Sequence, residues 1–225
     1  MAALAAPARR YTDRMSTTPV FDAQADTAQA RLVRAKEASR SIARLTSADK
    51  ARLLETIAEA IESSTARIVE ANALDIERGR ADAIGESLID RLRLDERRVA
   101  ALASAVRDVA TLPDPIGQVI GGHRMPNGVA LEQVRVPFGV VGAIYEARPN
   151  VTVDIAALAL RAGNAVVLRG GSAARESNTV LVAVMRQALA DLGHDPEAIQ
   201  SRHDFGRDGA KAMMHARGLI AASYT

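Results

Sequence analysis

Residues 139 to 150 read Gly139-Val140-Val141-Gly142-Ala143-Ile144-Tyr145-Glu146-Ala147-Arg148-Pro149-Asn150, and the first half of this run indicates the class of fold. Residues 139–144 are apolar, rich in β-branched side chains and too short for a helix. They predict a strand that is buried on both faces. Strands of that kind belong to parallel sheets, which need helices on both sides.

The segments that follow alternate between helix and strand. A helix is expected from about Val151 to Ala162, and a second buried strand covers Ala165 to Leu168. A glycine-rich turn at 169–172 then leads into a further helix over 174–192. This order is typical of a doubly wound α/β domain. The sequence therefore predicts an α/β protein with N-terminal helices followed by an incomplete doubly wound parallel sheet.

The chain before this unit has a helical pattern from Asp22 to about Pro113. Either Thr46 or Ser47 is expected to cap a helix at its N-terminus, with Asp49 favourable in the first turn. The apolar positions of this helix recur at helical spacing: Leu53, Leu54, Ile57, Ala58 and Ile61.

Two more helices are expected in the same region. One should run from about Ser64 to Glu77 and stop near Gly79, because glycine commonly ends helices. Asp95 is expected to cap the other, which Pro113 would end.

A change of period after Pro115 predicts a β-hairpin over residues 116–136. Its strands are expected at 116–121 and 129–136, joined through the turn sequence Pro126-Asn127-Gly128. Such a hairpin beside a βαβ unit often serves as an arm for homo-oligomerisation. A plain edge hairpin is an equally good interpretation.

Composition excludes several classes of function. The formal net charge of the 225 residues is only +2, and basic residues alternate with acidic ones, so nucleic acid is not an expected partner. The sequence has no cysteine, which excludes disulfides and thiolate metal sites, and its four histidines lack metal-ligand spacing. Because no apolar run is long enough for a membrane span, we expect no membrane partner. Residues 1–19 are expected to form a disordered extension, although a transit-like tail is an alternative over the first 14.

Two loops follow the carboxyl ends of the predicted strands, where open α/β sheets bind ligands. One contains Glu146 to Asn150; the other contains Arg169, Gly170, Gly171 and Ser172. Arg169 would present a planar cation suited to phosphate, the glycines would let the backbone approach a ligand, and Ser172 could cap the next helix. The pattern is neither the dinucleotide fingerprint nor a P-loop. These residues alone therefore favour neither the presence nor the absence of an anion-binding site.

A longer run, from Gln133 to Asp154, resembles the signature region of the γ-glutamyl phosphate reductase family, within the aldehyde dehydrogenase superfamily. Further segments fit the same family: 68–72, 88–92, 163–172 and 176–178. The resemblance covers roughly residues 20 to 200. It implies the aldehyde dehydrogenase fold in a cytoplasmic enzyme of proline biosynthesis, which reduces γ-glutamyl phosphate to glutamate-5-semialdehyde with NADPH through a cysteine thioester.

The same resemblance implies roles for the loop residues. Arg169 and Ser172, with Gly170 and Gly171 between them, would bind the adenosine ribose of NADP(H), and Arg169 would favour the 2′-phosphate. Glu146 would lie along the cofactor. Asn150 would fall near an oxyanion-stabilising amide. Arg148 would contact a carboxylate or phosphate of the small-molecule substrate, or else form an internal ion pair.

The sequence also departs from the family. The family continues beyond residue 225, so residues 20–225 are interpreted as an incomplete cofactor-binding domain without its catalytic domain: helices at 22–113, the hairpin at 116–136, a βαβα unit at 137–193 and a divergent tail at 201–225. Ser201 to Gly206 is polar where a third parallel strand is expected, and the pattern is lost again after Ile220, which suggests reading-frame errors. We therefore predict a reductase by descent that is inactive alone. The alternative is a non-catalytic NADP-binding or oligomerisation module.

Overall fold

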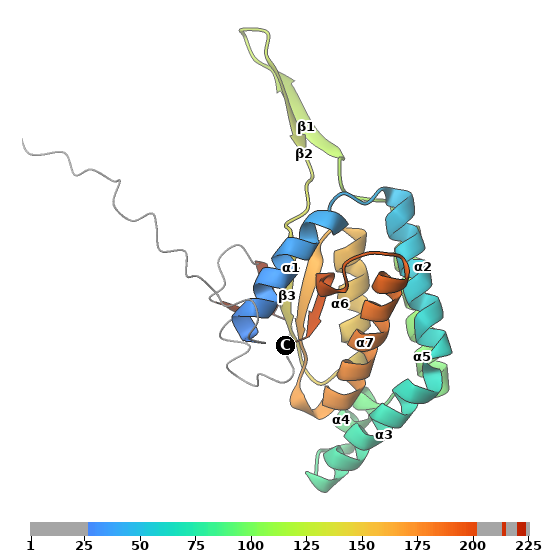
Figure 1. Cartoon of the computed structure of the whole chain (residues 1–225). Coiled ribbons are helices and arrows are strands. Elements are labelled where there is room, and N and C mark those ends of the chain that lie inside the picture. The colour runs from blue at the N-terminus through green and yellow to red at the C-terminus, as the bar shows by residue number, and fades with distance from the viewer. Residues whose placement is uncertain (1–26, 202–212, 215–219, 224–225) are drawn as a thin grey trace, which may run out of the picture.

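A computed structural model of the protein describes residues 27–201, 213–214 and 220–223, and its centre is a parallel sheet (Figure 1). The sheet has four strands in the order β5-β4-β3-β6, and every neighbouring pair is parallel. Their bounds are Val140–Ile144 for β3, Ala165–Arg169 for β4, Ile199–Ser201 for β5 and Ile220–Ser223 for β6. The predicted α/β class is therefore confirmed, with the two strands expected from residues 139–144 and 165–168 side by side at its centre.

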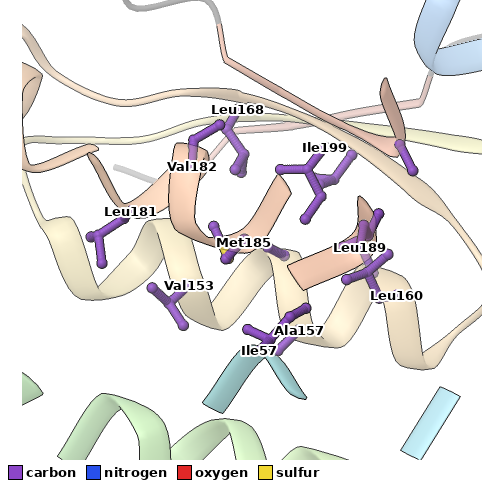
Figure 2. Packing of buried hydrophobic residues seen from close by; sticks show 14 of the residues in the cluster. Ile57, Val153, Ala157, Leu160, Leu168, Leu181, Val182, Met185, Leu189 and Ile199 are labelled. Carbon is purple, nitrogen blue, oxygen red and sulfur yellow. The ribbon is translucent and has the colours of Figure 1, made fainter. Parts of the chain in front are cut away.

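The sheet is buried because helices cover both of its faces. Helix α1 (Ala28–Ile42) packs on one face, while α6 (Pro149–Arg161) and α7 (Arg175–Asp191) pack on the other. Residues 165–168 of β4 are completely buried, which explains why this strand is apolar at every position. On the side of α6 and α7, Leu168 of β4 and Ile199 of β5 belong to the same buried cluster as Met185 of α7 (Figure 2).

A second layer of helices lies behind α6 and α7. It consists of α2 (Ser47–Ser63), α3 (Thr65–Ala81) and α5 (Glu96–Thr111), with the short α4 (Glu86–Leu92) between α3 and α5. Ile57 of α2 points toward Ala157 of α6, and both belong to the buried cluster (Figure 2). Since Ile57 is buried, its removal from water contributes roughly 2 kcal/mol to folding.

The helix caps test the local predictions directly. Thr46 accepts a hydrogen bond from the backbone N–H of Asp49, whose carboxylate accepts in return from the N–H of Thr46, so the capping box at this end is complete. Asp95 caps α5, as predicted. The third predicted helix is confirmed as α3, although it ends at Ala81, two residues beyond the predicted stop near Gly79.

Gly79 is instead a packing position. A Cβ atom at this residue would lie 2.9 Å from Cδ1 of Ile89 in α4, a helix that was not predicted as a separate element. The glycine therefore brings α4 close to the side of α3.

The hairpin stands apart from the body of the protein (Figure 1). Its strands, β1 (Val119–Arg124) and β2 (Ala130–Val134), are antiparallel, and every residue in both is exposed. They begin and end up to three residues away from the predicted strands, and their register shifts between Val119 and Gly121. At the base of the hairpin the buried Lys50 ammonium donates to Asp114 Oδ2 at 2.9 Å.

The third parallel strand, which the polar stretch from Ser201 to Gly206 was expected to lack, is present in the structure. It forms as β5, which begins at Ile199, two residues before the polar stretch, and ends at Ser201. Residues 202–206 and the predicted extension over 1–19 lie outside the described residues. None of the helices in the described part of the chain is long and apolar enough to cross a lipid bilayer.

Candidate functional site

The order of the strands places the candidate site at the carboxyl end of β3. Strands β4 and β5 lie on one side of β3 and β6 lies on the other, so the direction of the strand order reverses at β3. Ligands of open α/β sheets bind at this kind of switch point, beyond the carboxyl ends of the strands. The loops that leave β3 and β4 meet at this edge, where the N–H of Tyr145 donates to the carbonyl of Arg169 at 3.1 Å.

Gly170 and Gly171 bring these two loops into contact. A Cβ atom on Gly170 would lie 2.5 Å from Nδ2 of Asn178, and one on Gly171 would lie 2.7 Å from the backbone nitrogen of Ala147. The space that the glycines leave is therefore filled by the protein itself. Their close approach is to the neighbouring loop, which differs from the interpretation that they open the backbone to a ligand.

A buried network of three polar side chains lies beneath the same loops. The hydroxyl of Thr152 donates to Oδ1 of Asn178 at 2.6 Å, so the hydroxyl of Tyr145, also 2.6 Å from Thr152 Oγ1, must be the donor in that bond. Burial raises the pKa of Tyr145 above its ordinary value, although the hydrogen bond to Thr152 opposes this shift. Because the network joins β3, α6 and α7, it fixes the loops relative to the helices behind them.

The N-terminus of α7 is capped by a residue from another helix. Asp75 of α3 accepts from the backbone N–H groups of Glu176 and Ser177 at 3.1 and 2.8 Å and from the hydroxyl of Ser177 at 2.7 Å. Burial raises the pKa of Asp75 above its ordinary value, and these hydrogen bonds oppose the shift. Asp75 therefore occupies the donors with which a helix N-terminus otherwise binds an anion.

Ser172 does not cap α7, so that prediction was wrong. It begins the short 3₁₀ helix η1 (Ser172–Ala174), which forms no side-chain cap, and α7 starts only at Arg175. Ser172 is exposed, and Arg169, the last residue of β4, is partly buried. Both residues therefore lie in the chain segment that leaves the carboxyl edge of the sheet.

Asn72, the last residue of the family segment 68–72, supports the same region. Its amide donates to the carbonyl of Leu92 at 2.8 Å and to Ser177 Oγ at 3.0 Å, and its oxygen accepts from the N–H of Leu94 at 2.7 Å. With Asp75 it forms a polar junction between α3 and α7, and the sequence alone had not revealed this role.

The loop after β3 carries the other predicted site residues. Arg148 lies 3.4 Å from the carboxylate of Glu146, so the internal ion pair that the sequence left open is formed. The Nε of Arg148 is nevertheless buried without an acceptor among the described residues. Asn150 is exposed in the first turn of α6, because this helix begins at Pro149, two residues before the predicted start.

Asp154 lies one turn further along α6 and was not among the predicted site residues. The amide of Asn150 approaches its carboxylate at 3.4 Å. Burial raises the pKa of Asp154 above its ordinary value, and this hydrogen bond only partly opposes the shift. The spacing of four residues from Asn150 on one helix face was the signal that could have found it.

Metal chemistry has no support in the part of the molecule that is described. Among those residues, no group of at least three His, Asp or Glu side chains could hold a metal ion. The whole sequence also lacks cysteine, so this chain provides no thiolate nucleophile.

Comparisons with known proteins agree with this arrangement. The sequence profile described as the aldehyde dehydrogenase family matches residues 8–225. The chain is 58% identical over 187 residues to a γ-glutamyl phosphate reductase of Kineococcus radiotolerans, covering 83% of this chain and 43% of that protein. It is 56% identical over 196 residues to the one from Clavibacter michiganensis, covering 87% of this chain and 45% of the relative. The chain therefore spans less than half the length of these curated relatives.

Solved structures show the same likeness. The crystal structure of γ-glutamyl phosphate reductase from Thermotoga maritima superimposes with a TM-score of 0.85 at 33% identity, over 89% of this chain and 49% of that one. The yeast reductase superimposes with a TM-score of 0.78 at 23% identity, over 88% of this chain and 52% of that one, a likeness of fold alone.

The broader family profile extends over the C-terminal residues. It covers 201–225, where the resemblance to the reductases was expected to be lost, and β6 forms there as a strand of the sheet. The profile also starts before residue 20.

Proposed function

Because this chain belongs to the aldehyde dehydrogenase family, we propose that it forms the first part of the nicotinamide-binding domain of a γ-glutamyl phosphate reductase. The observation that carries the proposal is the family run from Gln133 to Asp154, whose polar end lies at the switch point of the sheet. The reaction would reduce γ-glutamyl phosphate to glutamate-5-semialdehyde, a step in the biosynthesis of proline. Such an enzyme would work in the cytoplasm.

The residues at the switch point fit NADP(H) in part. Arg169 and Ser172 stand at the end of β4, and an arginine there would pair with the 2′-phosphate of the ribose. Glu146 would lie along the cofactor. Gly170 and Gly171 offer no cradle for a pyrophosphate, and α7 offers no free N-terminus, since protein groups fill both positions. Cofactor binding by this chain therefore depends on side chains.

The chemistry divides between cofactor and protein. When bound, the nicotinamide supplies the hydride that reduces an acyl group to an aldehyde. The Asn150 amide would donate a hydrogen bond to the carbonyl oxygen of that group. The Nε of Arg148, buried without an acceptor among the described residues, would donate to a phosphate oxygen of the substrate.

The nucleophile cannot come from this sequence, which has no cysteine. A thioester with the substrate would need a thiol from another segment or another polypeptide. We therefore expect the 225 residues alone to bind cofactor without turnover. The test is the reverse reaction of the purified chain with glutamate-5-semialdehyde, NADP and phosphate, followed by NADPH absorbance. Turnover above a mock-purified control would overturn the expectation that the chain alone is inactive.

Cofactor preference has its own test. The Arg169→Ala variant should bind NADPH about tenfold more weakly and NADH nearly as well as the parent chain, measured by fluorescence titration. Arg67→Ala is the control, because Arg67 is exposed on α3, far in the sequence from the switch point. Equal losses for both cofactors would contradict a contact with the 2′-phosphate.

The second candidate function is a non-catalytic module for NADP binding or for assembly, and the hairpin favours it. Val119, Leu131 and Val134 are between 42 and 57% exposed on strands that touch water at every residue. We propose that residues 116–136 pair with a second copy of the chain. Leu131→Lys should reduce the mass measured by light scattering to that of a monomer, while Leu88→Lys, an equally exposed leucine on α4, should not.

A further inference from the structure

A cavity of about 580 Å³ lies between α5, the connection from α4 to α5 and the first turns of α6. This volume is within the range of small-molecule sites. Arg148 and Asn150, two residues predicted to meet the substrate, line the cavity together with Asp154 of α6. The segment from α4 to α5 contributes arginines to the lining, and the apolar part of the lining is formed by Leu94, Ala101, Leu102 and Ala105.

The cavity is lined by groups of opposite charge, the carboxylate of Asp154 and several arginines, and these do not form ion pairs with each other. Asp154 forms no ion pair with any arginine or lysine among the described residues, and its contact is the 3.4 Å approach of Asn150. Among the arginines that line the cavity, Arg98 is held by the carboxylate of Asp90 at 2.8 Å, which partly neutralises its charge. Arg93, exposed after the end of α4, has no ion pair with a described residue. The cavity thus offers a carboxylate and a guanidinium to a ligand that carries both charges.

One glutamyl group can reach both Asn150 and Asp154 of α6. These residues lie four apart on one face of the helix, and the amide nitrogen of Asn150 is 3.4 Å from the carboxylate of Asp154. The acyl carbon and the α-nitrogen of an extended glutamyl group are joined by four bonds and lie about 5 Å apart. An acyl group at Asn150 therefore brings the ammonium to Asp154, while the methylene groups lie along the apolar wall.

We propose that this cavity binds the α-amino-acid end of the substrate, with Asp154 receiving the ammonium and Arg93 the α-carboxylate. The inference rests on the proposed function, since it takes the γ-glutamyl chain as the ligand. Asp154 and Arg93 would then make the protein prefer a substrate with both an ammonium and an α-carboxylate over a dicarboxylic acyl group without the ammonium.

Binding of three simple acids to the chain tests the proposal. L-Glutamate carries both head-group charges, glutarate lacks the ammonium and 4-aminobutyrate lacks the α-carboxylate. Asp154→Asn should weaken L-glutamate and 4-aminobutyrate about tenfold and leave glutarate within about twofold in calorimetric titrations. Arg93→Gln should weaken L-glutamate and glutarate and leave 4-aminobutyrate unchanged.

The crossed pattern separates a direct contact from a structural effect, because a distorted cavity would weaken all three acids alike. Glu59→Gln, at an exposed position of α2, is the control and should change none of them. Equal losses, or no binding of L-glutamate to the parent chain, would overturn the proposal. A parallel titration with NADPH separates this proposal from the proposed function. If NADPH binds but the crossed pattern is missing, only the head-group site is refuted. If neither NADPH binding nor the crossed pattern is seen, the proposed function is refuted as well.

Discussion

Two polar regions of this protein contain the same residue types in opposite circumstances. At the junction of α3 and α7, Asn72 and Asp75 are almost completely buried, and their polar atoms have partners at 2.7 to 3.1 Å. In the cavity between α5 and α6, Asn150 is exposed and Asp154 has a single long contact. Buried polar groups that are fully hydrogen-bonded hold a fold together, whereas groups left without partners beside a cavity are available to a ligand.

The largest expected effect is that of Asp75→Ala. It would leave two buried N–H groups and the hydroxyl of Ser177 without their acceptor, so the free energy of unfolding should fall by about 3 kcal/mol. Urea denaturation measures this change. Asp154→Ala is the matched variant from the cavity and should stay within about 0.5 kcal/mol of the parent. Similar losses for both aspartates would break the distinction between the regions.

The asparagines should repeat the contrast at a smaller scale. Asn72→Ala would remove the acceptor of the Leu94 N–H and a donor to Leu92 and Ser177, which should cost about 2 kcal/mol of unfolding free energy. Asn150→Ala removes an exposed amide and should leave stability nearly unchanged. A large stability loss in Asn150→Ala would place this residue in the framework of the fold, contrary to its assignment to the site.

The smallest expected effect is a pH-dependent gain of stability in Asp154→Asn. The pKa of Asp154 in the folded protein lies above its ordinary value of 3.8, so the contribution of this carboxyl is most favourable below that value and declines as it ionises at higher pH. The variant cannot ionise and should therefore be slightly more stable than the parent at pH 7. The difference should vanish at low pH in thermal unfolding; a variant that is less stable at neutral pH would contradict the raised pKa.

Much of the fold could be predicted because its signals are local. The capping box at Thr46 and the cap at Asp95 depend on residues three positions apart, and the two central strands depend on apolar runs of about five residues. Predictions failed where a distant segment decided the outcome. Gly79 lies inside α3, where it lets Ile89 of α4 approach closely, and β5 pairs with β4 from Ile199 onward.

The candidate site divides in the same way. The loops 146–150 and 169–172 were placed at the edge of the sheet from the sequence, since parallel strands present their carboxyl ends together. The four-residue spacing from Asn150 placed Asp154 on the same helix face, but the cavity that both residues line also needs residues of α4 and α5, which the sequence did not place there.

The sequence by itself determined the class of fold, the positions of most helices and the resemblance to one family of reductases. These depend on the period of apolar residues and on short motifs, which act over a few positions along the chain. Only the tertiary structure decided that Asp75 caps a helix 102 residues later in the chain and that two glycines serve the contact between loops. Hydrogen bonds and close contacts between distant segments have no local signature, because their partners meet only when the chain has folded.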